Sequence, residues 1–133
     1  MKKIIYTKSA PSPIGPYNQA ILWTSGSQRT LYTSGQIAIN PETGELDIED
    51  LEKETHLVMK NLEEVLKAAD MDFSSVVKTS IFLSDMNNFG TVNKIYGSYF
   101  NEEDAPARET VEVANLPKFV NVEISAIAIA IDG

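Results

Sequence analysis

The chain contains no cysteine and only one histidine, His56, among its 133 residues. The lack of cysteine excludes disulfide bonds, thiolate metal sites and a cysteine nucleophile. A single histidine excludes a multi-histidine metal site within one chain and argues against a serine–histidine catalytic triad. His56 itself lies among charged residues in a predicted helix, so we assign it to the surface and give it no role.

Basic residues are also scarce, because 11 Lys and Arg face 19 Asp and Glu, for a net charge of −8. Nucleic-acid binding requires a cationic surface that displaces counterions from phosphates, so we expect no nucleic-acid partner. No apolar run approaches the roughly 20 residues that cross a bilayer, and the N-terminus lacks the pattern of a signal peptide. We therefore expect a single cytoplasmic domain, residues 1–133, that does not bind a membrane.

Hydrophobic periodicity predicts elements in the order β-β-β-α-β-α-β-β. The predicted strands are 2–7, 19–25, 30–39, 75–83, 109–114 and 120–131, and the helices are 49–69 and a second one capped by Asp85. This order indicates an α+β fold, a six-stranded and mostly antiparallel sheet with two helices packed on one face. The short turn 115–118 predicts that the last two strands are antiparallel neighbours.

The last predicted strand is apolar on both of its faces. Val122, Ile124 and Ala126 alternate with Ile127 and further isoleucines. Two helices can cover only one face of the sheet, so the second face needs another cover. Another copy of the same chain provides it, and we expect a closed homo-oligomer.

Glu123 is the only charged residue between Phe119 and Ile131. A carboxylate in so apolar a strand must be paired, protonated or directed into a cavity. Two interpretations stand: a functional carboxylate in a polar pocket, or a structural one that forms an ion pair or faces solvent at a sheet edge. Arg108 and Thr110 share one strand face, and the predicted hairpin could direct them to the same side as Glu123, although the sequence does not fix the register.

An arginine at position 108 can bind a carboxylate through two parallel hydrogen bonds, or it can be an ordinary surface residue. Asn93 lies on the predicted apolar face of the second helix, where it either caps a loop or contacts a ligand. Tyr17 follows a loop stiffened by prolines, and Ser34 and Gly35 lie on the third strand. A packed tyrosine and a close backbone contact at the glycine are the plainer interpretations.

Several of these segments together resemble the RidA (YjgF) family of reactive-intermediate enamine/imine deaminases. They run in order along nearly the whole chain: Ile14-Gly15-Pro16-Tyr17, Tyr32-Thr33-Ser34-Gly35-Gln36-Ile37, Val77-Lys78-Thr79, Asp85-Met86-Asn87, Val92-Asn93, Pro106-Ala107-Arg108, Val111-Glu112-Val113, Leu116-Pro117 and Val122-Glu123-Ile124. The resemblance implies a chorismate-mutase-like fold, a homotrimer with sites between subunits, and a part in metabolite damage control. It also implies hydrolysis of 2-iminobutanoate and 2-iminopropanoate to 2-oxo acids and ammonia.

By the same resemblance, Arg108 corresponds to the carboxylate-binding arginine, Glu123 to the glutamate near the catalytic water and Tyr17 to a pocket tyrosine. Ser34, Gly35 and Asn93 correspond to further pocket residues. The chain departs from the family at Thr110, where many members have cysteine, and in the 23–30 hairpin, which is expected to be longer. We count Thr110 among the substrate-binding residues.

The expected mechanism requires no metal and no cofactor: Arg108 binds the substrate carboxylate, and Glu123 with Tyr17 holds the attacking water. A different hypothesis is a ligand-binding or protein-interacting trimer that uses the same clefts without turnover. Ribonuclease or translation-inhibitor activity is a third, which the negative net charge opposes.

Overall fold

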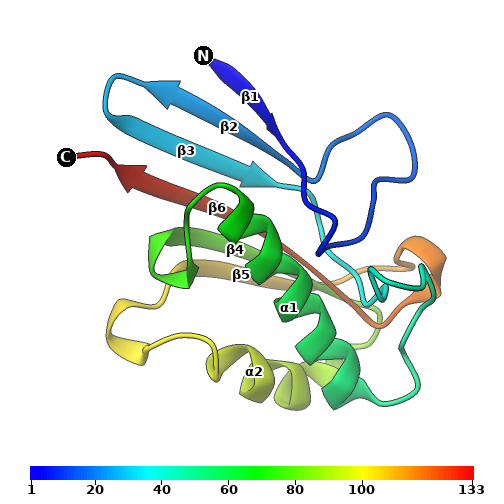
Figure 1. Ribbon diagram of the computed structural model, residues 1–133. Coiled ribbons are helices and arrows are strands. Elements are labelled where there is room, and N and C mark those ends of the chain that lie inside the picture. Colours follow the sequence, from blue (N-terminus) through cyan, green and yellow to red (C-terminus); the bar gives the residue numbers. More distant parts are fainter.

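A computed structural model, which describes residues 1–133, contains one six-stranded sheet and two α-helices (Figure 1). The strand order across the sheet is β1-β2-β3-β6-β4-β5, and all neighbours are antiparallel except the parallel pair β4 and β5. The predicted α+β class, element order and mostly antiparallel sheet are confirmed. The elements are β1 (Lys2–Ile5), β2 (Ala20–Ser25), β3 (Gln28–Thr33), α1 (Leu51–Ala68), β4 (Val76–Leu83), α2 (Phe89–Gly97), β5 (Ala107–Glu112) and β6 (Val122–Ile131).

Both helices lie on the same side of the sheet, as predicted (Figure 1). Helix α1 begins after Asp50, whose carboxylate accepts hydrogen bonds from the first-turn amides of Glu52 and Lys53. Its apolar positions at three- and four-residue steps form the buried face toward the sheet. Helix α2 is entered through a 3-10 turn, Met86–Asn88, so Asp85 caps that turn rather than the helix itself.

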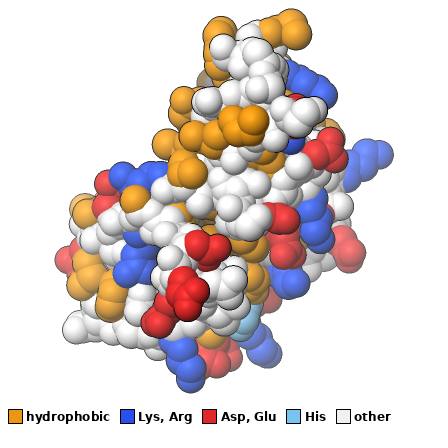
Figure 2. All heavy atoms as spheres, turned by 90° about the vertical axis from the view of Figure 1, so that its left-hand side faces the viewer, with side chains coloured by type: hydrophobic (Ala, Val, Ile, Leu, Met, Phe, Trp, Pro, Cys, Tyr) orange, Lys and Arg blue, Asp and Glu red, His pale blue; other side chains and the backbone are white.

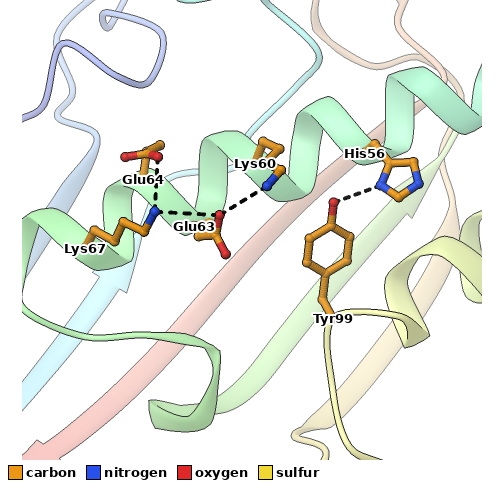
Figure 3. A network of polar contacts seen from close by, with 6 residues as sticks. All are labelled: His56, Lys60, Glu63, Glu64, Lys67 and Tyr99. Atoms are coloured by element: carbon orange, nitrogen blue, oxygen red, sulfur yellow. Dashed lines mark hydrogen bonds and ion pairs between the residues drawn. The ribbon is translucent and has the colours of Figure 1, made fainter.

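The outer side of α1 carries a chain of charged contacts (Figure 3). Lys60 and Lys67 both approach the Glu63 carboxylate, at 3.6 and 3.9 Å. His56 is exposed, and its Nδ1 lies 2.8 Å from the hydroxyl of Tyr99, which follows α2. His56 thus connects the two helical segments at the surface, in agreement with its assignment as a surface residue.

The position of β5 differs from the prediction. Strand β6 lies between β3 and β4, and β5 pairs with the outer side of β4, so β5 and β6 are not neighbours. The expected antiparallel hairpin was wrong because the connection is not a tight turn. It contains a 3-10 turn, Pro117–Phe119, in which Lys118 and Phe119 have φ of 56° and 57°. The chain then passes the end of β4, where the amide of Ser84 donates to the carbonyl of Asn121.

The predicted strand 30–39 is also shorter in the structure. Strand β3 ends at Thr33, and the following residues leave the β2–β3 ladder. Gln36 forms an isolated bridge with Ile124 of β6 through two backbone hydrogen bonds of 2.8 and 3.1 Å. The β2–β3 turn, in contrast, is tight: Gly26 and Ser27 join the strands, and Gly26 has a φ of +60°. The segment after β3 therefore bends toward β6 and forms one wall of a pocket.

The side of the sheet opposite the helices has no cover within the chain. On the helix side of β6, Ile124, Ala126 and Ala128 are buried. On the other side, Ile127 and Ile129 are only partly buried. Ile127 and Ile129 pair across the sheet with Tyr32 and Thr30, and Thr30 with Trp23, so this face continues over β3 and β2. We call it the bare sheet face: Ile4, Ile21, Trp23, Tyr32, Ile127, Ile129 and Ile131.

No helix of the structure is long and apolar enough to span a membrane. Figure 2 looks onto the molecule from the left of Figure 1, and acidic and basic side chains are interspersed over its lower part. Hydrophobic side chains gather in the upper part of the same view. The surface seen there has no continuous basic patch.

Candidate functional site

A pocket of about 440 Å³ opens where the N-terminal loop, the segment after β3 and the turn before β6 meet. Tyr17, Ser34, Gly35, Lys118 and Glu123 are among its lining residues. These residues come from three separate parts of the chain, and the bend after β3 brings two of those parts together. Four of the seven site residues predicted from the sequence therefore share one pocket.

Glu123 is the one carboxylate in this pocket. It lies on a central strand and is half-buried, so it is not the edge-strand carboxylate facing solvent that the sequence left open. None of the ion pairs of the chain involves Glu123. Burial raises the pKa of Glu123 above its usual value, and no neighbouring group lowers it. Such a carboxyl group can exchange protons at a higher pH than an ordinary glutamate.

Gly35 lies directly against the Glu123 carboxyl group. A Cβ atom at residue 35 would stand 2.7 Å from Cδ and 2.8 Å from Oε2 of Glu123. These distances are shorter than any tolerated carbon contact, so even alanine would force the carboxyl group to move. The plainer interpretation of Gly35, a close backbone contact, and its assignment to the pocket thus describe the same feature.

The N-terminal loop is fixed by a residue that the sequence analysis did not single out, Gln19. Its side chain is buried, and both the oxygen and the nitrogen of its amide group form hydrogen bonds to the loop. Oε1 accepts from the amide of Thr7, and Nε2 donates to the carbonyl of Pro11 at 2.9 Å. No local pattern marks such a glutamine, because its partners lie many residues away along the chain.

Tyr17 is half exposed at the rim of the pocket, and its hydroxyl accepts a hydrogen bond from the amide of Ile14 at 3.3 Å. Ser34 connects the segment after β3 to the same loop. Its hydroxyl donates to the carbonyl of Asn18, and its backbone amide donates to the carbonyl of Gln19. Ser34 therefore holds the pocket walls together, and Tyr17 lines the same pocket.

Arg108 lies elsewhere, at the start of the edge strand β5 and beside α2. Its Nη1 donates to Oδ1 of Asn93 at 2.7 Å. Its guanidinium carbon lies 5.6 and 5.1 Å from the ring centroids of Phe89 and Tyr96. These contacts fix the plane of the guanidinium and leave donors free for a planar anion. Asn93 is exposed rather than buried on the apolar helix face, and it orients Arg108 instead of capping a loop.

Thr110 shares the strand face of Arg108, and it is partly buried. Its hydroxyl oxygen is buried and has no hydrogen-bond partner in the chain. A buried hydroxyl without a partner costs free energy, which a bound ligand or water recovers when it supplies one. Thr110 therefore has an unpaired hydroxyl two residues from Arg108 on the same face of β5.

The predicted site residues thus form two groups on opposite faces of the sheet. Arg108 pairs across the sheet with Thr79, whose other partner, Ala126, is buried on the helix side. Glu123 is an odd number of residues from Ala126 on the same strand, so it points to the bare sheet face. The expectation that Arg108 and Thr110 project to the same side as Glu123 was wrong, because it rested on the incorrect β5–β6 hairpin.

Lys118 is a second pocket residue that the sequence analysis treated only as part of a turn. It lines the pocket because the chain adopts positive φ at two consecutive residues, Lys118 and Phe119. Neither residue is a glycine or an asparagine, so the sequence carries no signal for this conformation. In the whole chain, no group of three or more His, Asp or Glu side chains is close enough together to hold a metal ion.

Comparisons with known proteins agree with this architecture. Residues 7–130 match the family model described as Endoribonuclease L-PSP. A RutC family protein of Synechocystis is 50% identical over 96% of this chain and 95% of its own length. The mouse protein named 2-iminobutanoate/2-iminopropanoate deaminase is 47% identical over 97% of this chain and 92% of its own length.

Solved structures are similar over nearly the full chain. The Rid family protein YyfA of Yersinia pestis superposes with a TM-score of 0.88 at 50% identity, covering 96% of this chain and 98% of that one. The E. coli protein TdcF with bound serine has a TM-score of 0.85 at 40% identity and covers 96% and 98%. Sequence and structure therefore agree that the chain belongs to the RidA (YjgF) family.

Proposed function

We propose that this protein is a cofactor-free deaminase that hydrolyses 2-imino acids, such as 2-iminobutanoate and 2-iminopropanoate, to 2-oxo acids and ammonia. The observation that carries the proposal is the half-buried Glu123 carboxyl group, held against Gly35 in a pocket and without an ion-pair partner. The relationship to the mouse deaminase, at 47% identity over nearly the whole chain, supports the same reaction.

We propose in addition that the protein forms a closed homotrimer whose sites lie between subunits. The bare sheet face supports the association, because it exposes about half of the side chains of Trp23 and Tyr32 and 65% of Ile131. The number of subunits follows from the family resemblance. Closed assembly of this kind places one surface of each chain against a different surface of the next.

The assembly would also complete the site. Within one chain the sheet separates Arg108 from Glu123, so a small substrate cannot contact both. In the trimer, the pocket of one subunit would face the β5 edge of the next. The Arg108 guanidinium of that neighbour would then bind the substrate carboxylate, with Asn93 and the Phe89 and Tyr96 rings fixing its orientation.

In this site the reaction would proceed by proton transfers through one carboxyl group. A water molecule between Glu123 and Tyr17 attacks the carbon of the protonated imine, and Glu123 takes a proton from the water as the neutral carbinolamine forms. Glu123 then gives that proton to the amine nitrogen, which becomes an ammonium leaving group. The carbon–nitrogen bond breaks as the carbinolamine hydroxyl loses its proton to Glu123, so a 2-oxo acid and ammonia leave, and Glu123 releases its proton to water. General acid–base catalysis of this kind contributes about 10²- to 10⁴-fold.

The test is release of 2-oxobutanoate from 2-iminobutanoate generated in situ by a dehydratase or an amino-acid oxidase. The wild-type protein should accelerate release over the uncatalysed rate. Arg108→Ala should abolish the acceleration, and Arg108→Lys, which keeps the charge but not the planar pair of donors, should raise KM. Circular dichroism confirms that each variant is folded. An inert wild-type protein, tested with several imino acids, would contradict the proposal.

A second candidate function is binding without turnover. The E. coli relative TdcF has been crystallised with bound serine, whose carboxylate and 2-amino group resemble those of the proposed substrate. Saturable binding of serine or 2-oxobutanoate by a wild-type protein that does not accelerate imine hydrolysis would favour this function. The endoribonuclease named in the family description receives less support, because the chain has a net charge of −8 and Figure 2 shows no continuous basic patch.

A further inference from the structure

Glu54 is a fully buried carboxylate that the proposed reaction does not use. It lies in the first turn of α1 with no exposed surface, and none of the ion pairs of the chain includes it. Burial raises the pKa of Glu54, and hydrogen bonds from Asn121 oppose this shift. A buried carboxylate without a cation is costly to a fold, so its position requires a local reason.

That reason is visible in its hydrogen bonds. The backbone amide of Asn121 donates to Oε2 of Glu54 at 2.8 Å, and Nδ2 of Asn121 donates to Oε1 at 2.7 Å. One residue therefore occupies both carboxylate oxygens. Helix α1 thus holds Asn121, which lies two residues before Glu123.

The segment held in this way ends a strained turn. Lys118 and Phe119 both have positive φ, a conformation that is unfavourable for residues with a side chain and persists only where the flanking structure imposes it. Pro117 and Lys118 line the pocket on one side of Asn121, and Glu123 lines it on the other. The side-chain contact between Glu54 and Asn121 therefore anchors the chain at a point between these two pocket-lining segments.

We propose that Glu54 is a positioning residue for the site: through Asn121 it fixes the Pro117–Phe119 turn and the start of β6, and so determines where the Glu123 carboxyl group stands in the pocket. The kinetic part of this inference rests on the proposed deaminase function. Glu54 does not touch the substrate, because its side chain is completely buried.

The chemistry of the contact explains why an acid occupies position 54. Both groups of Asn121 that face it are donors, and a carboxylate offers acceptors only. A glutamine offers one acceptor and one donor, so it would pair fully only if residue 121 presented an acceptor in place of its amide nitrogen. The contact can therefore be broken and restored by exchanging which residue carries the charge.

The experiment uses Asn121→Asp, the double variant Glu54→Gln/Asn121→Asp, and Asn101→Asp as a matched change at an exposed asparagine. In Asn121→Asp two carboxyl groups face each other, and kcat should fall about ten- to a hundredfold with little change in KM, since displacement of a catalytic group acts on kcat. In the double variant the amide introduced at position 54 donates to the carboxylate introduced at position 121, and kcat should return to within about threefold of wild type. Asn101→Asp should behave as wild type.

A second readout does not depend on turnover. The titration of the Glu123 carboxyl carbon, followed by NMR below the melting temperature of every variant, should shift in Asn121→Asp and return in the double variant. A purely structural contact would leave that titration unchanged. Unchanged kcat and unchanged Glu123 titration in Asn121→Asp would overturn the inference, as would failure of the double variant to restore either. If wild type itself is inert, the deaminase proposal fails and the titration alone decides the role of Glu54.

Discussion

Arg108 and Glu123 point away from opposite faces of the same sheet, although both of their strands pair with β4. Arg108 pairs with Thr79 and lies on the helix side, and Glu123 pairs with Phe82 and lies on the bare side. The sheet therefore separates the group proposed to bind the carboxylate from the group proposed to move protons. Any reaction that uses both requires two copies of the chain, which is the central claim of our account.

Gly35→Ala should reduce turnover without unfolding the protein. The added methyl group would meet Cδ of Glu123 at 2.7 Å, so the carboxyl group must move away from its position. A displacement of about 1 Å can cost about a hundredfold in rate, and we expect kcat to fall by about tenfold or more. Gly97→Ala is the control, because a Cβ there meets nothing within 4 Å and the change should leave kcat unaltered. Equal kcat in both variants would count against Glu123 as the proton carrier.

The pH dependence of kcat should report the buried Glu123 carboxyl group. The group must be ionised to take a proton from water, and burial raises its pKa above the usual 4.5. Activity should therefore fall as the pH drops through an apparent pKa above 4.5. The residual activity of Glu123→Gln should lack this limb. Rates corrected for uncatalysed hydrolysis at each pH provide the measurement, and an identical limb in Glu123→Gln would assign it to another group.

The pKa of Glu54 predicts how stability changes with pH. Because burial raises the pKa in the folded state, the fold binds this proton more tightly than the unfolded chain does. The contribution of Glu54 to the free energy of unfolding should fall as the pH rises from 4.5 through the raised folded pKa. Melting temperatures of wild type and of Glu54→Gln, which has no titratable group at this contact, should diverge over this range. A difference between them that does not depend on pH would contradict the assignment.

Ile129→Glu should prevent assembly and abolish activity. The side chain lies on the bare sheet face, where a carboxylate at a subunit interface would lose its hydration without a partner. Sedimentation velocity should show a shift from the oligomer to the monomer. Leu46→Glu, at an exposed leucine outside the sheet, should keep the wild-type mass. An assembled and active Ile129→Glu protein would show that this face is not the interface.

Thr110→Val should weaken substrate binding without harming the fold. The hydroxyl of Thr110 is buried and lacks a partner, so its removal should leave the melting temperature equal or slightly higher. If the hydroxyl binds the substrate carboxylate beside Arg108, KM should rise several-fold, equivalent to about one hydrogen bond. Thr110→Ser keeps the hydroxyl and should retain the wild-type KM. Equal KM in all three proteins would remove Thr110 from the substrate-binding residues.

Hydrophobic periodicity predicted the bounds of a helix or strand well where burial of one face of that element sets the spacing of its apolar residues. The apolar steps of α1 and the alternation of β6 follow from burial on one face, and both elements lie within a few residues of the predicted bounds. The position of β5 depended instead on the connection after it. That connection was interpreted as a hairpin, and the positive φ of Lys118 and Phe119, which no residue type signals, carries the chain past β4.

The incorrect β5–β6 hairpin also explains which features of the site could be predicted and which could not. Individual residues such as Glu123 and Gly35 stand out because a charge interrupts an apolar strand and a glycine interrupts a β-rich segment. Their grouping depends on register, which fixes the face of each side chain and is set by long-range pairing. Gln19 and Glu54 were missed for a related reason: their partners are distant in sequence, so only the folded structure reveals what they hold.

The most direct test of the central claim is complementation between two impaired variants. Arg108→Ala and Glu123→Gln should each keep only residual activity as homo-oligomers, and their mixed oligomers can be isolated by co-expression with two different tags. If each site takes Arg108 from one subunit and Glu123 from the next, one of the three sites in every mixed trimer contains both residues, and activity should return to about a third of wild type. Mixed oligomers that remain as impaired as their parents would contradict a site shared between subunits.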